Sequence, residues 1–448
     1  MPFSLGGAQD PDTPNTIIAW ILAGGVGLPD RDYYVKPEKR FADARAGYLV
    51  YIAKIFALSG TPVEEAKGAA QTVMRFETAL AKATLDNVAM HDPHAIVHTA
   101  SFDVLQKMTP HFDWILFYKS ANLQPGKVNV EQPEFLAEFD RQLVSTPLAD
   151  WKIYLRRQLL NSSADNLSQS FVNARFDFCQ SQLAGVGKLK PRATRCAETT
   201  DAFLGEALGH EYVKRTFPPE AKQRAQAMVG NILSTMHDTI ENADWMTPAT
   251  KQRALEKLST LHVKVGYPDK WTDYSSVNIS RAEYFADTIA ASRFLVANEF
   301  SAIGKPVDRS RWDVTPATSN ARYKFLPNEI TLPAGILQPP AFSLNYADAV
   351  NYGAIGFVIG HEISHAIDDQ GAQFDAQGKL ASLVDSRRPR QFQGPYRLSR
   401  QAIRRFHNRR AGRHAHERQT DSRRIHRRPR RPEDRLLRLQ ENATGYVL

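Results

Sequence analysis

The sequence contains little cysteine, with only two among its 448 residues, Cys179 and Cys196. Two cysteines cannot build the disulfide framework that stabilises small secreted domains. They also lack the clustered spacing of a zinc knuckle, so neither is expected to bind a metal. We therefore expect both to be structural residues, and the sequence leaves open whether they pair with each other.

The sequence also lacks a long hydrophobic run near its start. The longest early run, residues 17–28, spans 12 residues, whereas a helix needs about 20 apolar residues to cross a bilayer. The segment 1–15 before it contains no Lys or Arg, so it lacks the charged region that opens a signal peptide. As written, the sequence predicts neither a membrane segment nor an export signal.

Lysine is missing from the end of the chain. Residues 386–448 contain 19 Arg, no Lys and 5 acids, which is a net charge of +14. The whole chain carries +9, so the rest carries 9 − 14 = −5. Clustered arginines can bind nucleic acid through its phosphates, but such a segment, poor in large apolar side chains, is also typical of disorder without a partner. We favour the second interpretation and expect no nucleic-acid partner.

Helical periodicity dominates the first 260 residues. Apolar residues recur every three or four positions in 64–86, 219–243 and 248–261, which is the period of a helix. Thr247 before Pro248 is typical of a helix start. The turn-rich segment 266–276 then predicts a junction between two domains. With 42% hydrophobic residues, a chain of this length can bury a sizeable core.

The pattern changes after this junction. Residues Asn328 to Leu332 alternate between polar and apolar as a strand does, and Pro333 favours a position at the edge of a sheet. The nearly all-apolar segment 349–367 predicts a helix that is buried in the middle of its domain.

This predicted helix contains the sequence His361-Glu362-Ile363-Ser364-His365. Histidines four residues apart project from one helical face and can bind one metal ion, and Glu362 then lies beside the open coordination position. Zinc suits this arrangement, because it accepts nitrogen ligands in a tetrahedron and can keep a water as the fourth ligand. The ion lowers the pKa of that water towards 7. Glu362 can take the proton while that water attacks a peptide carbonyl. The alternative interpretation is that the two histidines and the glutamate bind no metal and only hydrogen-bond within a protein core. Burying such polar groups among apolar residues costs free energy unless each has a partner.

Several segments together resemble the neprilysin and endothelin-converting enzyme family of zinc metalloendopeptidases. The longest are 328–342, which reads Asn-Glu-Ile-Thr-Leu-Pro-Ala-Gly-Ile-Leu-Gln-Pro-Pro-Ala-Phe, and 351–380, which contains both histidines; shorter ones are 244–248, 266–271 and 27–34. The resemblance covers about residues 1–382. It implies a mainly α fold, with a large helical domain beside a thermolysin-like α+β catalytic domain that carries the HExxH helix.

The resemblance also implies roles for individual residues. One Zn²⁺ per chain would be held by His361, His365 and a later glutamate, with Glu362 as the general base. Asn320 and Ala321 match the pair that holds the backbone of an oligopeptide substrate, although Arg322 stands where the family usually has tyrosine. The family is periplasmic, extracellular or membrane-anchored, and this sequence, with no signal or anchor, leaves its own location open.

The resemblance further divides the chain into four parts. We expect a helical domain whose start is missing, a junction, an incomplete catalytic core and an aberrant, disordered tail, at 1–265, 266–319, 320–382 and 383–448. The family takes its third zinc ligand from a later Glu-Asn-x-x-Asp helix, which is not recognisable here. The nearest candidates, Glu433 and Glu441, lack that motif. We therefore expect the chain as written to be inactive, and a non-catalytic scaffold or a binding protein with a basic tail is the alternative.

The arginine-rich tail has a possible origin in the genetic code. The family continues with Trp-Trp-Thr where this chain has Leu383-Val384-Asp385-Ser386. The codons CUG GUG GAC U, read one base later, give UGG UGG ACU, which encodes Trp-Trp-Thr. We hypothesise that residues 383–448 are translated out of frame. A nucleotide sequence with no base missing or added near Ser382 would refute this.

Overall fold

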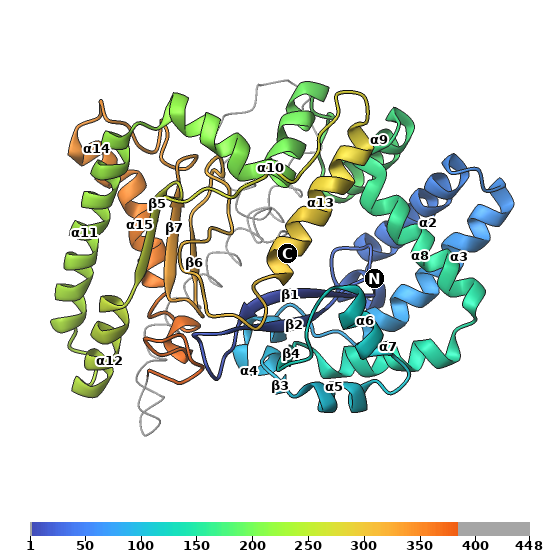
Figure 1. Ribbon diagram of the computed structural model, residues 1–448, viewed down its shortest axis with the longest axis horizontal. Coiled ribbons are helices and arrows are strands. Elements are labelled where there is room, and N and C mark those ends of the chain that lie inside the picture. The colour runs from blue at the N-terminus through green and yellow to red at the C-terminus, as the bar shows by residue number, and fades with distance from the viewer. Residues whose placement is uncertain (1, 384–448) are drawn as a thin grey trace, which may run out of the picture. The chain divides into compact units, whose positions relative to one another are not determined.

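The computed structural model describes residues 2–383 (Figure 1). Residues 2–242 and 251–383 belong to one compact unit, and residues 243–250 lie outside it. The predicted tail and the candidate ligands Glu433 and Glu441 fall outside the described residues. The domain boundary expected near residue 265 stays a prediction.

The first strands form a sheet that the helical periodicity did not predict. Four strands pair in the order β1-β2-β4-β3. They are β1 (Phe3–Gln9), β2 (Ile17–Ala23), β3 (Thr99–Ala100) and β4 (Val128–Val130). β1 and β2 are antiparallel, β4 runs parallel to β2, and β3 is antiparallel to β4. The early apolar run is therefore largely strand β2, whose residues Ile18 to Ile21 are buried.

Helices from the first half of the chain pack around this sheet (Figure 1). They are α1 (Arg31–Val35), α2 (Lys39–Leu58), α3 (Val63–Lys82), α4 (Pro93–Ile96), α5 (Phe102–Met108), α6 (Trp114–Ser120), α7 (Pro133–Ser145), α8 (Leu148–Ser163) and α9 (Gln169–Arg175). A 3-10 turn, Ala89–His91, precedes α4, and a π-helical segment, Phe176–Leu183, follows α9. Aromatic side chains form much of their core: the Phe3 ring lies 5.3 Å from Trp114 and 5.4 Å from Phe139.

The second half of the described chain begins with four further helices, of which the first two are the longest of the described chain. They are α10 (Arg192–Thr216), α11 (Pro219–Glu241), α12 (Pro248–Ser259) and α13 (Tyr284–Phe300). The predicted segments 64–86, 219–243 and 248–261 correspond to α3, α11 and α12, so the helical interpretation is confirmed there. Thr247 caps α12 as expected, because its Oγ1 accepts a hydrogen bond from the backbone N–H of Thr250 at 3.2 Å. No helix of residues 2–383 is long and apolar enough to cross a membrane.

A three-stranded sheet lies beside α11 and α15 (Figure 1). Its strands are β5 (His262–Gly266), β6 (Arg322–Lys324) and β7 (Glu329–Pro333), in the order β5-β7-β6. The prediction that residues 328–332 form an edge strand was wrong, because β7 pairs with β5 on one side and β6 on the other. Pro333 is tolerated because it ends the strand, and Ala334 N–H donates to Gly266 O at 2.8 Å instead.

The predicted apolar helix over 349–367 is also different in the structure. It is two helices, α14 (Asp348–Gly353) and α15 (Ile355–Ser364), separated by Ala354 at φ −105° and ψ −84°. Glycines at 353 and 356 flank the break and weaken helix continuity there. α15 buries Ile355, Ile359 and Ile363 on one face, but Phe357 on another face is 74% exposed. Among the described residues the helix is therefore half-buried rather than enclosed.

Candidate active site

The two histidines of the motif converge at the end of α15. His361 lies in its last turn, and His365 caps it. Their Nε2 atoms are 3.2 Å apart. Two nitrogen ligands at 2.0–2.1 Å from one tetrahedral zinc would be about 3.3 Å apart. The two nitrogens, which share a hydrogen bond in the structure, are therefore at a separation compatible with two ligands of a single zinc ion.

His365 is held by an aspartate that the sequence analysis did not single out. Its Nδ1 lies 2.7 Å from Oδ2 of Asp368. The backbone N–H groups of Gln370 and Gly371 donate to Asp368 Oδ1 at 3.0 and 2.8 Å. A carboxylate bound to the second ring nitrogen is the usual partner of a metal-binding histidine, since it leaves Nε2 facing the metal. The sequence feature that could have predicted this contact is the aspartate three residues after His365.

This arrangement shifts the pKa values of both partners. The hydrogen bond that His365 Nδ1–H donates to Asp368 raises the pKa of His365 above its ordinary value, against the effect of burial. Burial raises the pKa of Asp368, but hydrogen bonds from His365 and from the amides of Gly371 and Gln370 outweigh it and lower that pKa overall. Asp368 is therefore a fixed negative charge behind His365.

Glu362, which lies between the two histidines in the sequence, is buried in the structure, with a residue exposure of 7%. Burial raises its pKa above the ordinary value, whereas His365, His361 and the backbone N–H of Tyr323 act in the opposite direction. A carboxylate with a raised pKa is a better proton acceptor at neutral pH than an ordinary surface glutamate.

The predicted substrate-binding pair lies directly before β6, the edge strand of the small sheet. Asn320 is exposed and Ala321 is buried. β6 contacts α15, and the Tyr323 ring lies 6.5 Å from that of His365. Arg322, at the position where the family has tyrosine, forms an ion pair with Asp313. Asn320 and Ala321 thus directly precede the strand that contacts the HExxH helix, and their role in substrate binding stays a prediction.

A third zinc ligand is not found in the described part of the chain. The only group of three potential ligands within residues 2–383 is His237, Asp238 and Glu241, which are exposed on α11. Both cysteines are free and half-buried, so neither pairs with the other in the structure.

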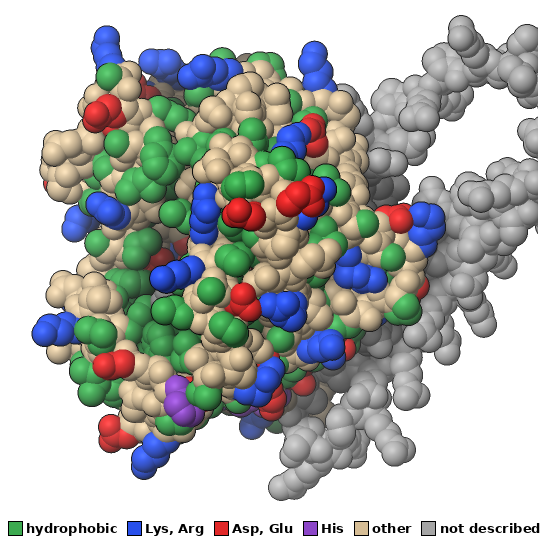
Figure 2. All heavy atoms as spheres, turned by 90° about the vertical axis from the view of Figure 1, so that its right-hand side faces the viewer, with side chains coloured by type: hydrophobic (Ala, Val, Ile, Leu, Met, Phe, Trp, Pro, Cys, Tyr) green, Lys and Arg blue, Asp and Glu red, His purple; other side chains and the backbone are tan. Residues whose placement is uncertain are grey.

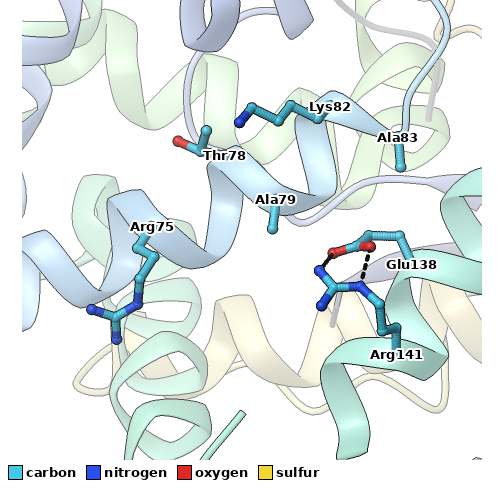
Figure 3. Close-up of a pocket in the computed structure, with 7 residues that line it drawn as sticks. All are labelled: Arg75, Thr78, Ala79, Lys82, Ala83, Glu138 and Arg141. Carbon is cyan, nitrogen blue, oxygen red and sulfur yellow. Dashed lines mark hydrogen bonds and ion pairs between the residues drawn. The ribbon is translucent and has the colours of Figure 1, made fainter. Parts of the chain in front are cut away.

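A surface groove between α3 and α7 is separate from this site (Figure 3). Arg75, Lys82 and Arg141 contribute cations to it. Arg141 forms two hydrogen bonds with Glu138, drawn in Figure 3, and Arg75 pairs with Asp150 at 2.8 Å. Two of its three cations are thus neutralised, and none of its lining residues belongs to the motif.

The fold and the site together define a class of protein. Two helix-borne histidines, a buried glutamate between them and a nearby sheet edge form the arrangement of a metal-dependent peptidase.

Comparisons with known proteins identify the family. Residues 1–268 and 320–422 each match peptidase family M13, and the second match extends beyond the described residues. The endothelin-converting enzyme homolog of Locusta migratoria is 30% identical over 393 residues, which is 84% of this chain and 54% of the insect protein. Neprilysin-3 of Drosophila melanogaster is 29% identical over 400 residues, which is 85% of this chain and 51% of that protein.

Solved structures agree. Zinc metalloprotease Zmp1 of Mycobacterium tuberculosis, in complex with an inhibitor, has a TM-score of 0.81 and 34% identity, covering 86% of this chain and 59% of that one. PepO from Lactobacillus rhamnosis has a TM-score of 0.81 and 27% identity, covering 88% and 62%. The chain belongs to peptidase family M13, and the predicted family and mainly α fold are confirmed. It spans about half the length of the curated relatives it matches.

Proposed function

We propose that this protein contributes the zinc-binding and proton-transfer groups of an endopeptidase that hydrolyses oligopeptides. The observation that carries the proposal is the convergence of the His361 and His365 Nε2 atoms beside the buried carboxylate of Glu362. Membership of the family supports it. The substrate class is the family's, and no residue of the described chain narrows it further.

Each residue has a separate task in the proposed reaction. His361 and His365 would hold one zinc ion, and Asp368 keeps Nδ1 of His365 engaged so that Nε2 faces the metal. A bound zinc ion acidifies water and polarises a carbonyl. Glu362 accepts a proton from the attacking water and returns it to the leaving amide nitrogen. The peptide extends along the free edge of β6, where backbone hydrogen bonds and the Asn320 side chain orient it.

We expect residues 2–383 to hold zinc weakly without a further ligand. Catalytic zinc sites use three protein ligands, and the described residues supply two. Activity of the 448-residue chain therefore depends on a ligand outside this range, and Glu433 and Glu441 are the candidates named from the sequence.

The alternatives have less support. A non-catalytic scaffold would not need Asp368 engaged with His365. Nucleic-acid binding is an alternative only for the basic tail, which falls outside the described residues; on the described chain, the face shown in Figure 2 carries Lys and Arg dispersed among Asp and Glu. Cations on α2 and α3 also have acidic partners, such as Lys54 with Asp177 and Arg75 with Asp150.

The test is zinc-dependent hydrolysis of a fluorescence-quenched oligopeptide with a hydrophobic residue at the cleavage site. The full chain is compared with Glu362→Gln, which keeps both histidines and removes the base. Because the family's Glu-Asn-x-x-Asp motif for the third ligand is not recognisable in the sequence, we expect the chain as written to match this control. A chain in which the reading frame after residue 382 is restored should cleave the peptide, and Glu362→Gln should abolish that activity. Cleavage unaffected by Glu362→Gln would contradict the proposal.

A further inference from the structure

Lys257 is a buried lysine that the proposed mechanism does not use. It lies on α12 with a residue exposure of 0%. Its Nζ donates hydrogen bonds to the backbone carbonyls of Gly371 at 2.6 Å and Phe374 at 2.8 Å. Burial lowers its pKa to about 8, although Asp368 and Asp375 act to raise it. Burying an ammonium group is costly, so an apolar residue would suit this position better if only packing were required.

The carbonyls that Lys257 binds belong to the turn after the HExxH helix. This turn contains the 3-10 segment Gly371–Gln373. The backbone of Gly371 is bound on both sides, because its carbonyl accepts from Lys257 and its N–H donates to Asp368 Oδ1. Asp368 in turn binds Nδ1 of His365. A continuous chain of hydrogen bonds therefore leads from Lys257 to a predicted zinc ligand.

The turn also touches His365 directly. A Cβ atom added to Gly371 would lie 1.9 Å from the carbonyl oxygen of His365, which is far inside van der Waals contact. Only glycine fits at this position without a shift of the backbone. Movement of Gly371 would thus reach His365 by two routes, one through the Asp368 carboxylate and one through the backbone at the end of α15.

We propose that Lys257 is a positioning residue for His365, acting by fixing the 371–374 turn that holds Asp368. The expected effect of Lys257 on zinc affinity rests on the proposed function, whereas its expected effect on the orientation of His365 does not. Partners behind a metal-binding histidine set its tautomer and ring orientation. Lys257 adds a further partner behind His365, and it does so from α12, a helix that contributes no residue to the HExxH motif.

Thr260, which directly follows α12, offers a matched control. Its Oγ1 donates to the carbonyl of Ala376 at 2.9 Å, further along the same segment. It also accepts a hydrogen bond from Asn328 Nδ2 at 3.0 Å. Thr260 Oγ1 also lies 3.1 Å from the backbone carbonyl of Lys257, but it makes no hydrogen bond to Gly371, Asp368 or the Lys257 side chain. Thr260→Val therefore removes an anchor of the segment and leaves the hydrogen bonds of the Lys257 ammonium group in place. This variant shows how the His365 resonance and the zinc affinity respond to destabilisation of the segment alone.

The test compares Lys257→Met with Thr260→Val in the 448-residue chain, using two measurements. The first is the downfield Nδ1–H proton resonance of His365 in the zinc-free chain at pH 7, assigned by its loss in His365→Gln. We expect Lys257→Met to lose or broaden this resonance and Thr260→Val to keep it. The second is zinc affinity by chelator competition, which Lys257→Met should weaken about 10-fold or more and Thr260→Val less than twofold.

The outcomes separate the two proposals. If the unaltered chain binds no zinc, the proposed function fails, and the His365 resonance still decides the role of Lys257. If Lys257→Met keeps the resonance, and its zinc affinity where measurable stays within twofold of that of Thr260→Val, Lys257 is only a stabilising residue. Should Lys257→Met not fold by circular dichroism, Lys257→Gln, whose amide can donate to one of the two carbonyls, replaces it in both measurements.

Discussion

Replacing Glu77 with glutamine should remove a large part of the stability of the helices around β1 and β2. The Glu77 side chain is fully buried and lies 3.2 Å from Arg157 Nη1, which is also buried. Its carboxylate accepts hydrogen bonds from Tyr34 at 2.7 Å, from Tyr48 at 2.9 Å and from the N–H of Gly27 at 3.0 Å. This network fixes the segment 27–34, one of those that resemble the family.

The magnitude follows from the burial of both charges. Burial raises the pKa of Glu77, and Arg157 with the hydroxyl donors opposes that effect. Removing one partner of a buried ion pair leaves the other uncompensated, which costs about 3–5 kcal/mol. Native stabilities are about 5–15 kcal/mol, so Glu77→Gln should remove at least about a fifth of the free energy of unfolding.

The assay is urea unfolding followed by circular dichroism, with Arg141→Ala as the control. Arg141 pairs with Glu138 on the surface, and such pairs contribute less than about 1 kcal/mol. The double variant Glu77→Leu/Arg157→Met removes both charges and should lose less stability than the two single changes summed. If Glu77→Gln is no less stable than Arg141→Ala, the reasoning about the buried pair is refuted.

Two further predictions concern the surroundings of the site. Asp368→Asn should weaken zinc binding about 10- to 100-fold, because the negative charge behind His365 is lost. Isothermal titration calorimetry measures this affinity, and an unchanged value would show that Asp368 does not act on His365 as a zinc ligand. The second prediction is a pH dependence, since the pKa of Lys257 falls to about 8 in the folded chain from 10.5 when unfolded. The unfolded state then binds more protons between pH 8 and 10.5, so the stability of the unaltered chain relative to Lys257→Met should rise over that range by on the order of 2–3 kcal/mol. A flat or falling difference in urea unfolding would contradict the buried charge.

The features that the sequence predicted are those encoded locally. The period of 219–241 and the Thr247-Pro248 start were sufficient for α11 and α12. The spacing of His361 and His365 was sufficient to place both on one helical face, and their convergence in the structure agrees with it. In each case residues close in the chain determine the geometry.

The features that were missed depend on partners far along the chain. β7 is central because β5, more than 60 residues earlier, pairs with it, and Pro333 alone suggested an edge. The break at Ala354 divides a segment whose composition predicted one helix. Lys257 reads as an ordinary residue on a charged helix, and only the fold shows that it is buried against the turn after His365.

The central claim is that His361 and His365 together bind one zinc ion. X-ray absorption spectroscopy at the zinc edge, on the full chain with one equivalent of zinc, tests it most directly. Two imidazole nitrogen ligands at about 2.0–2.1 Å are expected, with one imidazole lost in His365→Ala and none lost in His237→Ala, whose side chain lies in the exposed group on α11. A spectrum without imidazole ligands, or one that changes with His237 and not with His365, would contradict the account.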